Sequence, residues 1–245
     1  MNKLTGTVDR VTTPHRLVLW DIDQTLVDLR GVGAAWYTTA LAEVAGVELR
    51  ALPNFGGRTE RAISADILTS HGVEPTEENV RKLWLALIAV SESHAPTLSS
   101  SGRALPGAKE ALNAFATHGG IVQTLVTGNL PEISVHKLTA FELHEHVDFE
   151  IGGYGSLSAH RPDLVPAAVG HASAKHGTEF APESVVVIGD TPDDVRAALD
   201  NGAVAVAVAT GQFSAEELAD AGAHTVLGDL SDLVAVRAAV LGGAN

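Results

Sequence analysis

"LVLWDIDQTL" (residues 17–26) contains the feature on which the fold and the function of this chain depend. Four apolar residues lead directly into two aspartates, Asp21 and Asp23, which are separated by one residue. The apolar run is typical of a buried strand, but two ionised carboxylates at a poorly solvated strand end repel each other and resist desolvation. A bound divalent cation would offset both the repulsion between the carboxylates and the cost of their desolvation. This stretch therefore predicts a metal-dependent site at the end of a strand.

The strand pattern recurs along the chain and predicts the fold class. Near-continuous apolar runs of this kind are typical of central parallel strands that are covered on both faces. The four runs are "RLVLW" (16–20), "IVQTLV" (121–126), "SVVVIG" (184–189) and "AVAVAVA" (203–209), and helical patterns lie between the later ones, at 106–119, 162–177 and 192–202. From residue 104 to the end this alternation predicts an α/β fold with a doubly wound parallel, Rossmann-like sheet.

The interval between the first two runs predicts an inserted domain. It spans about 100 residues, too many for one crossover helix. Three helix-like segments lie there, at 33–46, 59–72 and 76–94, followed by "PTLSSSGRALPG" (96–107), which we expect to be a flexible return link. We therefore predict a core domain formed by residues 1–30 and 105–245, with a helical cap domain at 31–104.

Composition excludes several classes of partner. The formal net charge is −14, which argues against nucleic acid, because binding to nucleic acid requires clustered Lys and Arg. No apolar run approaches the roughly 20 residues of a membrane-spanning helix. The chain has no cysteine, which excludes disulfides and cysteine nucleophiles and fits a cytoplasmic location. Residues 1–15 lack the apolar core of a secretory signal, so we expect a short leader there.

Polar residues follow three of the predicted strands where each strand ends. Asp21 follows the first run, Thr127, Gly128 and Asn129 follow the second, and Asp190 follows the third, with Asp194 four residues later. In open α/β sheets, ligands bind beyond the carboxyl ends of the strands. These residues are therefore expected to meet at one edge of the sheet.

Four of these stretches resemble the signature motifs of one enzyme family. "DIDQT" (21–25), "TGN" (127–129), "HRP" (160–162) and "GDTPDD" (189–194) resemble the four motifs of the haloacid dehalogenase-like (HAD) hydrolase superfamily. The predicted insertion lies where that family has its helical type-1 cap, and the chain is similar to the phosphoglycolate phosphatase branch. Arg161 stands where the family usually has lysine. Gln24 stands where the family most often has glycine, at a position that we treat as permissive.

The resemblance implies a Mg²⁺-dependent phosphatase that acts on a small phosphorylated metabolite. Asp21 would be the nucleophile and would form an aspartyl-phosphate. Residues i and i+2 of an extended segment point to the same side, so Asp23 would reach the leaving group as general acid and base. By analogy with the family, Mg²⁺ would be held by Asp21, the backbone carbonyl of Asp23 and Asp190. Asp194, or less directly Asp193, would support this shell, and one of the two would cap the following helix.

The remaining motif residues would contact the substrate. Thr127 and the amides of Gly128 and Asn129 would bind phosphoryl oxygens, and Arg161 would supply a cation. In the cap, "GGRTERA" (56–62) resembles the family's stretch that faces the active site. There we expect Arg58 to lend its charge to an anionic substrate, Thr59 to cap the next helix, and either Glu60 or Arg61 to face solvent.

The sequence leaves some alternative functions open and disfavours others. A 2-haloacid dehalogenase would lack the second aspartate, and a phosphonate-cleaving relative would need a Schiff-base lysine in the cap, where Lys82 is the only lysine. No G-x-G-x-x-G follows the first strand, which disfavours a dinucleotide-binding domain. A phosphomutase of the β-phosphoglucomutase type and a catalytically idle binding protein on the same fold both stay open. The sequence leaves the identity of the substrate and the oligomeric state open as well.

Overall fold

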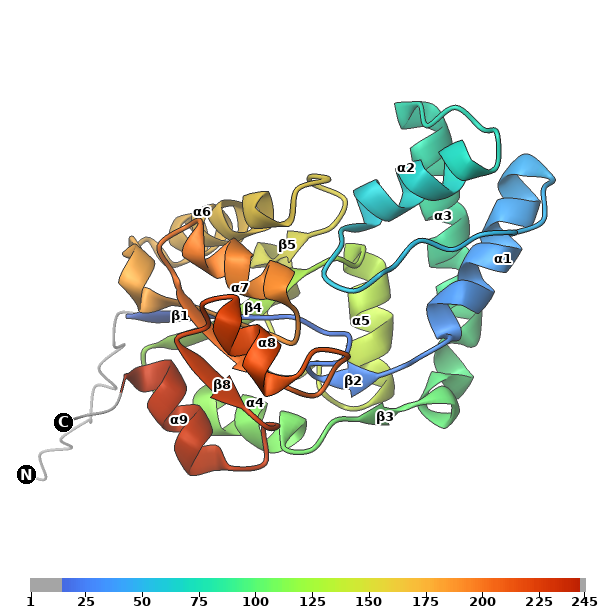
Figure 1. Cartoon of the computed structure of the whole chain (residues 1–245). Coiled ribbons are helices and arrows are strands. Elements are labelled where there is room, and N and C mark those ends of the chain that lie inside the picture. The colour runs from blue at the N-terminus through green and yellow to red at the C-terminus, as the bar shows by residue number, and fades with distance from the viewer. Residues whose placement is uncertain (1–14, 243–245) are drawn as a thin grey trace, which may run out of the picture.

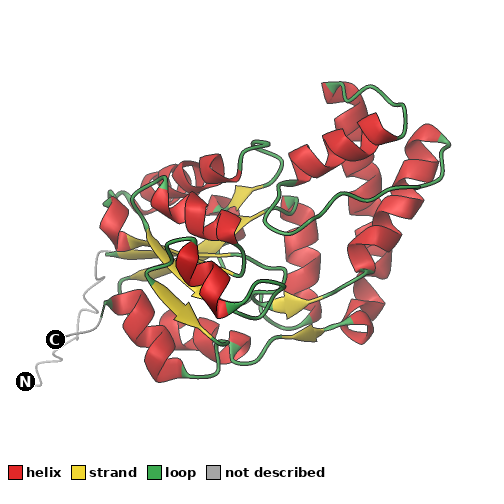
Figure 2. Cartoon of the chain, viewed as in Figure 1, coloured by secondary structure: helices red, strands yellow, loops and turns green. Residues whose placement is uncertain are grey.

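The core of the molecule is a six-stranded parallel sheet with helices on both faces (Figures 1 and 2). The computed structural model describes residues 15–242, so the expected leader lies outside this range except for His15. The strand order is β5-β4-β1-β6-β7-β8. The strands are β1 (Arg16–Trp20), β4 (Ile121–Thr127), β5 (Gly153–Tyr154), β6 (Val185–Gly189), β7 (Val204–Val208) and β8 (Thr225–Leu227). The prediction of an α/β fold with a doubly wound parallel sheet is confirmed.

Strand β1 lies at the centre of the sheet and joins its two faces. It pairs in parallel with β4 on one side and with β6 on the other. Because side chains alternate along a strand, Val18 and Trp20 belong to one hydrophobic cluster, and Leu17 and Leu19 belong to the other. All four are fully buried, which explains why the run is apolar throughout rather than alternating.

Helices form the two outer layers. Buried side chains of α4 (Ala108–Ala116) and α9 (Leu233–Leu241) belong to the cluster of Val18, and those of α6 (Leu164–His176), α7 (Pro192–Leu199) and α8 (Ala215–Asp220) belong to the cluster of Leu17. Helix α5 (Pro131–Ala140) follows β4. Short 3₁₀ segments η2 (Phe149–Ile151), η3 (Arg161–Asp163) and η4 (Pro182–Ser184) complete the connections. No helix in the part of the chain that the structure describes is long and apolar enough to cross a membrane.

A helical module is inserted between β1 and β4, as Figure 1 shows at the right of the view. Its helices are α1 (Val32–Ala45), α2 (Glu60–Ser70) and α3 (Glu77–His94), close to the three predicted segments. The module enters and leaves the core through one antiparallel ribbon, in which β2 (Val27–Asp28) pairs with β3 (Arg103–Ala104).

The expectation of a flexible return link at 96–107 is wrong. Most of this segment is ordered, because it forms the 3₁₀ helix η1 (Ala95–Ser101) and then β3. Gly102 lets the backbone approach closely, since a Cβ at this position would overlap with the carbonyl oxygen of Asp28. The glycine of this Gly/Ser-rich segment therefore allows a tight backbone contact with Asp28, and the segment does not form a flexible linker.

The packing of the module can be tested with two leucines of cap helices. Leu68 on α2 is fully buried, whereas Leu85 on α3 is 68% exposed. Leu68→Ala should lower the free energy of unfolding by about 2–5 kcal/mol, since it removes buried methyl groups and leaves a cavity. Leu85→Ala should change it by less than about 0.5 kcal/mol. Urea unfolding followed by circular dichroism measures both, and equal effects of the two substitutions would contradict this packing.

Candidate active site

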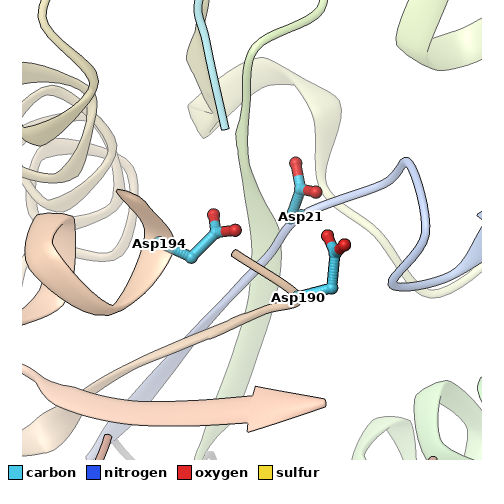
Figure 3. A group of neighbouring side chains, drawn as sticks. All are labelled: Asp21, Asp190 and Asp194. Atoms are coloured by element: carbon cyan, nitrogen blue, oxygen red, sulfur yellow. The ribbon is translucent and has the colours of Figure 1, made fainter. Parts of the chain in front are cut away.

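The predicted site residues meet at the carboxyl edge of the sheet, around the end of β1. The amide of Asp21 donates to the carbonyl of Ile188 on β6 at 2.8 Å, which continues the ladder by one residue and fixes the nucleophile candidate. Thr127 ends β4, and Asp190 directly follows β6. Figure 3 shows Asp21, Asp190 and Asp194 with their carboxylates converging on one point.

These three carboxylates form a buried acidic cluster. Oxygens of Asp21, Asp190 and Asp194 lie within 4.8 Å of one another, and all three residues are at most 6% exposed. Burial raises the pKa of Asp21 to about 7, with Arg161 opposing the rise and the charges of Asp194 and Asp23 adding to it. Burial also raises the pKa of Asp190 to about 9, assisted by the charges of Asp194 and Asp21. The cluster therefore carries more negative charge than its surroundings stabilise.

The cluster fits a hard divalent cation. Its donors are carboxylate oxygens, which Mg²⁺ prefers. Within residues 15–242, neither Asp21 Oδ2 nor Asp190 Oδ2 receives a hydrogen bond, so both oxygens have the lone pairs that a metal requires. Gly211 keeps the space beside Asp190 open, because a Cβ there would overlap with Asp190 Oδ2. Asp21 and Asp190 are therefore the side chains suited to hold the ion.

Arg161 supplies the cation that the sequence assigns to it. Its Nη2 donates to Asp21 Oδ1 at 2.8 Å and to Asp194 Oδ1 at 2.5 Å, and the side chain is 5% exposed. Burial alone would lower the pKa of the guanidinium, but the charges of Asp194 and Asp21 outweigh burial and raise it. A single nitrogen thus bridges two of the three carboxylates.

Thr191 is the N-cap of helix α7, and Asp194, not Asp193, completes its capping box. Its Oδ2 accepts from the backbone N of Thr191 at 3.1 Å and from Thr191 Oγ1 at 2.6 Å, while the Asp194 amide donates back to Thr191 Oγ1. Arg161 donates to the other oxygen, Oδ1. Both oxygens of Asp194 are therefore engaged by protein groups, and Asp194 supports the cluster by holding Arg161. Asp193 lies outside the cluster, pairs with Arg196 at 3.6 Å, and leaves no space for a side chain at Gly57.

Asp23 is held by a lysine that the sequence analysis missed. Lys137 Nζ donates to Asp23 Oδ1 at 2.7 Å, to Asp23 Oδ2 at 2.6 Å and to Asn129 Oδ1 at 2.7 Å. Asn129 Nδ2 donates to Asp23 Oδ2 at 2.8 Å and to Thr127 Oγ1 at 2.9 Å. A signal for Lys137 exists in the sequence, because it lies four residues after Ile133 on the buried face of α5.

Gln24 adopts the backbone conformation that explains the family's preference for glycine. Its φ is +63°, in the left-handed region that side chains disfavour. The turn is fixed on both sides, since the amide of Gln24 donates to the carbonyl of Val27 at 2.8 Å and its carbonyl accepts from Thr210 Oγ1. The expectation that this position is permissive is therefore wrong.

The cap loop at 56–62 lies against the loops of the sheet edge. The amide of Glu60 donates to the carbonyl of Gly128 at 2.8 Å, and the amide of Arg61 donates to the carbonyl of Gly155 at 2.9 Å. Thr59 caps α2 as predicted, with its side chain accepting from the amide of Ala62. These contacts bring the cap over the phosphate-binding candidates Thr127–Asn129.

Arg58 and Glu60 both have partners within the cap. Arg58 Nη2 pairs with Asp66 Oδ2 on α2 at 2.7 Å, so its charge is balanced within the cap. Glu60 is buried at 8% exposure rather than solvated, whereas Arg61 remains partly exposed and pairs with Glu77. Of these two neighbouring residues, the acidic one, Glu60, is therefore the one that is buried in the cap.

Comparison with known proteins points to one family. A family model described as HAD-hydrolase-like matches residues 160–233. The chain is 28% identical over 188 residues to a phosphoglycolate phosphatase of Nitrosospira multiformis, covering 76% of this chain and 79% of that protein. It is 29% identical over 226 residues to phosphoglycolate phosphatase 1 of Pseudomonas aeruginosa, covering 89% and 78%.

Solved structures share the fold. A hydrolase from Pseudomonas syringae superposes with a TM-score of 0.63 at 23% identity, covering 90% of this chain and 96% of that one. A haloacid dehalogenase-like family hydrolase from Streptococcus pneumoniae superposes with a TM-score of 0.58 at 16% identity, covering 91% and 99%. Both likenesses extend over the inserted helices as well as the sheet, because the coverage is nearly complete.

The raised pKa values of the cluster predict a pH-dependent stability in the absence of divalent metal. Folded Asp21 and Asp190 keep their protons up to pH values of about 7 and about 9, while the unfolded carboxyls lose theirs near 4. The free energy of unfolding should therefore fall as pH rises towards about 9. Asp190→Asn should flatten this fall, whereas Asp200→Asn, at the exposed end of α7, should not. Urea unfolding in chelator at several pH values measures it, and parallel slopes for wild type and Asp190→Asn would refute the cluster's role.

Proposed function

We propose that this chain, which is similar to HAD-like hydrolases, is a member of that superfamily and a Mg²⁺-dependent phosphatase that hydrolyses a small phosphorylated metabolite through an aspartyl-phosphate. The observation that carries this proposal is the convergence of Asp21, Asp190 and Asp194 with Arg161 at the end of β1. Phosphoryl transfer requires an in-line nucleophile, neutralised phosphoryl oxygens and a proton for the leaving group.

In the first step, a carboxylate oxygen of Asp21 attacks phosphorus, and the bond from phosphorus to the ester oxygen breaks. Asp23 gives its proton to that oxygen, so the alcohol leaves neutral. Thr127 and the amides of Gly128 and Asn129 bind the phosphoryl oxygens, and Arg161 holds Asp21 in place. Asp21, Asp190 and the backbone carbonyl of Asp23 would hold Mg²⁺, which would supply charge neutralisation at the phosphoryl group.

In the second step, water attacks the aspartyl-phosphate. Asp23 accepts a proton from that water, the bond from phosphorus to the Asp21 oxygen breaks, and inorganic phosphate leaves. Lys137 positions Asp23 for both steps, because its ammonium group donates to both carboxylate oxygens of Asp23 and to Asn129 Oδ1.

We propose that residues 31–104 act as the cap domain of this enzyme, on the core formed by 1–30 and 105–245. The contacts of Glu60 with Gly128 and of Arg61 with Gly155 support this assignment, because they place the module over the phosphate-binding loop. A cap in this position excludes water from the reacting centre. The proposed phosphate-binding groups point to a small anionic ester as partner, the acidic net charge argues against nucleic acid, and we expect the enzyme to act in the cytoplasm.

The function is tested by phosphate release from 4-nitrophenyl phosphate. We expect turnover with Mg²⁺, loss of turnover in excess chelator, and loss of at least about 10³-fold in Asp21→Asn, which removes the nucleophile. Asp200→Asn, on the exposed end of α7, should retain wild-type turnover. Undiminished turnover in chelator would refute the proposal that the reaction depends on a divalent metal ion. Release of inorganic phosphate without added sugar bisphosphate distinguishes this activity from a phosphomutase.

The pairing of Lys137 with Asp23 predicts a leaving-group effect. Lys137→Met removes three donated hydrogen bonds that position Asp23 and Asn129, so leaving-group protonation should suffer. We expect single-turnover alcohol release from an alkyl phosphate to fall by about tenfold or more, in line with a lost charged hydrogen bond. Release from 4-nitrophenyl phosphate should fall less, since a good leaving group needs little acid catalysis.

Asp23→Asn should reproduce this pattern with larger amplitude. Single-turnover release isolates the first step, so a defect in the hydrolysis of the intermediate does not blur the comparison. Equal losses on the alkyl and the aryl ester would show that Lys137 does not act through Asp23.

A further inference from the structure

A buried carboxylate of the cap, Glu60, has no role in the chemistry described above. It is the first residue of α2, and its amide is tied to the carbonyl of Gly128 at 2.8 Å. Gly128 belongs to the loop that holds the phosphoryl group in the proposed mechanism. The backbone of Glu60 is therefore fixed at the boundary between the phosphate-binding loop and the cap.

The side chain of Glu60 is held in place by neighbouring groups. The hydroxyl of Tyr37 donates to Oε1, and Ser64 Oγ donates to the same oxygen at 3.0 Å. Ser64 in turn accepts from Trp84 Nε1 at 3.0 Å, and the ring of Tyr37 stacks on Phe55 with centroids 5.7 Å apart. Within residues 15–242, Oε2 receives no hydrogen bond, so the carboxylate keeps one acceptor oxygen for a ligand.

Glu60 lies near the residues that handle the leaving group in the proposed mechanism, because its amide contacts Gly128 and the next residue, Asn129, donates to Asp23 Oδ2 at 2.8 Å. Burial raises the pKa of Glu60, hydrogen bonds from Tyr37 and Ser64 oppose the rise, and the charges of Lys137 and Asp23 both act on the group. Asp23 is the residue that protonates the ester oxygen in the proposed mechanism. A group attached to that oxygen would therefore have Glu60 among its nearest cap residues.

Three cations of the cap and of helix α5 are already paired. Arg58 pairs with Asp66 and Arg61 pairs with Glu77, both within the cap. Lys137 uses its three donors on Asp23 and Asn129. A substrate carboxylate would have to break one of these pairs and approach Glu60, whereas a hydroxyl or ammonium group would find an acceptor ready to bind it.

We infer that Glu60 selects phosphomonoesters whose leaving group carries a hydrogen-bond donor, a hydroxyl or an ammonium, and rejects those that carry a carboxylate. The inference rests on the proposed phosphatase activity and names its substrate class. It sets this chain apart from the relatives named as phosphoglycolate phosphatases, since phosphoglycolate has a carboxylate next to the carbon that bears its ester oxygen.

Three esters with two-carbon leaving groups test the inference: 2-hydroxyethyl phosphate, 2-aminoethyl phosphate and 2-phosphoglycolate. We expect the wild-type kcat/KM for each of the first two to exceed that for 2-phosphoglycolate by about tenfold or more, the scale of one charged hydrogen bond. Glu60→Gln, which keeps an oxygen for Tyr37 and Ser64, should lower the ratio of 2-aminoethyl phosphate to 2-phosphoglycolate by about tenfold. Glu43→Gln, which changes an exposed carboxylate on α1 that takes part in none of these pairs, should leave this ratio within about twofold.

Turnover of 4-nitrophenyl phosphate separates the two ways in which the inference can fail. If none of the four esters is hydrolysed, the proposed phosphatase function itself is wrong. If the aryl ester is hydrolysed but 2-phosphoglycolate is the preferred two-carbon substrate, or the ratio is the same in Glu60→Gln, the role of Glu60 is overturned while the function stands. The wild-type ratio needs no variant, so it decides the question even if Glu60→Gln does not fold.

Discussion

The arrangement of the site depends on one guanidinium nitrogen, Arg161 Nη2, that bridges the buried carboxylates of Asp21 and Asp194. Asp21 directly follows β1, Asp194 lies in the first turn of α7, and Arg161 begins η3, so this nitrogen holds three elements in a fixed relation. If all three cluster carboxylates are ionised, three negative charges meet one positive charge, and two negative charges remain. A divalent cation is the natural counter-ion for that remainder. The pKa of Asp190, raised to about 9 by burial, expresses the same imbalance.

A second ion pair organises the opposite side of the reacting centre. Lys137 and Asp23 lie beside Asn129, and Glu60 approaches from the cap. In the proposed mechanism the two ion pairs act at different places. Arg161 contacts the nucleophile Asp21, and Lys137 contacts Asp23, the general acid and base. Because the two ion pairs are separate, substitutions in the cap can change the contacts to the leaving group without changing the contacts to the phosphoryl group.

Much of the fold and part of the site could be predicted from the sequence. The run at 16–20 is apolar because both faces of β1 are covered, and a strand of this kind fixes where Asp21 must lie. Lys137 and Glu60 escaped prediction because charged residues are assigned to solvent unless a partner is visible. The partner of Lys137 lies 114 residues away in the chain, and that of Glu60 lies 23 residues away on another helix. Helix α5 was missed for a related reason, since Ser134 and Lys137 interrupt its buried face.

The ribbon of β2 and β3 has a consequence for how such a protein can change. Asp28 and Arg103 stand directly opposite each other in an antiparallel pair, where Cα atoms lie about 5 Å apart. The helical module is therefore attached at two points that a tight turn could join. A module attached in this way can be replaced, lengthened or lost in one genetic event while β1, β4 and β6 keep their register. The acidic edge of the sheet and the inserted helices are in this sense separable parts of one chain.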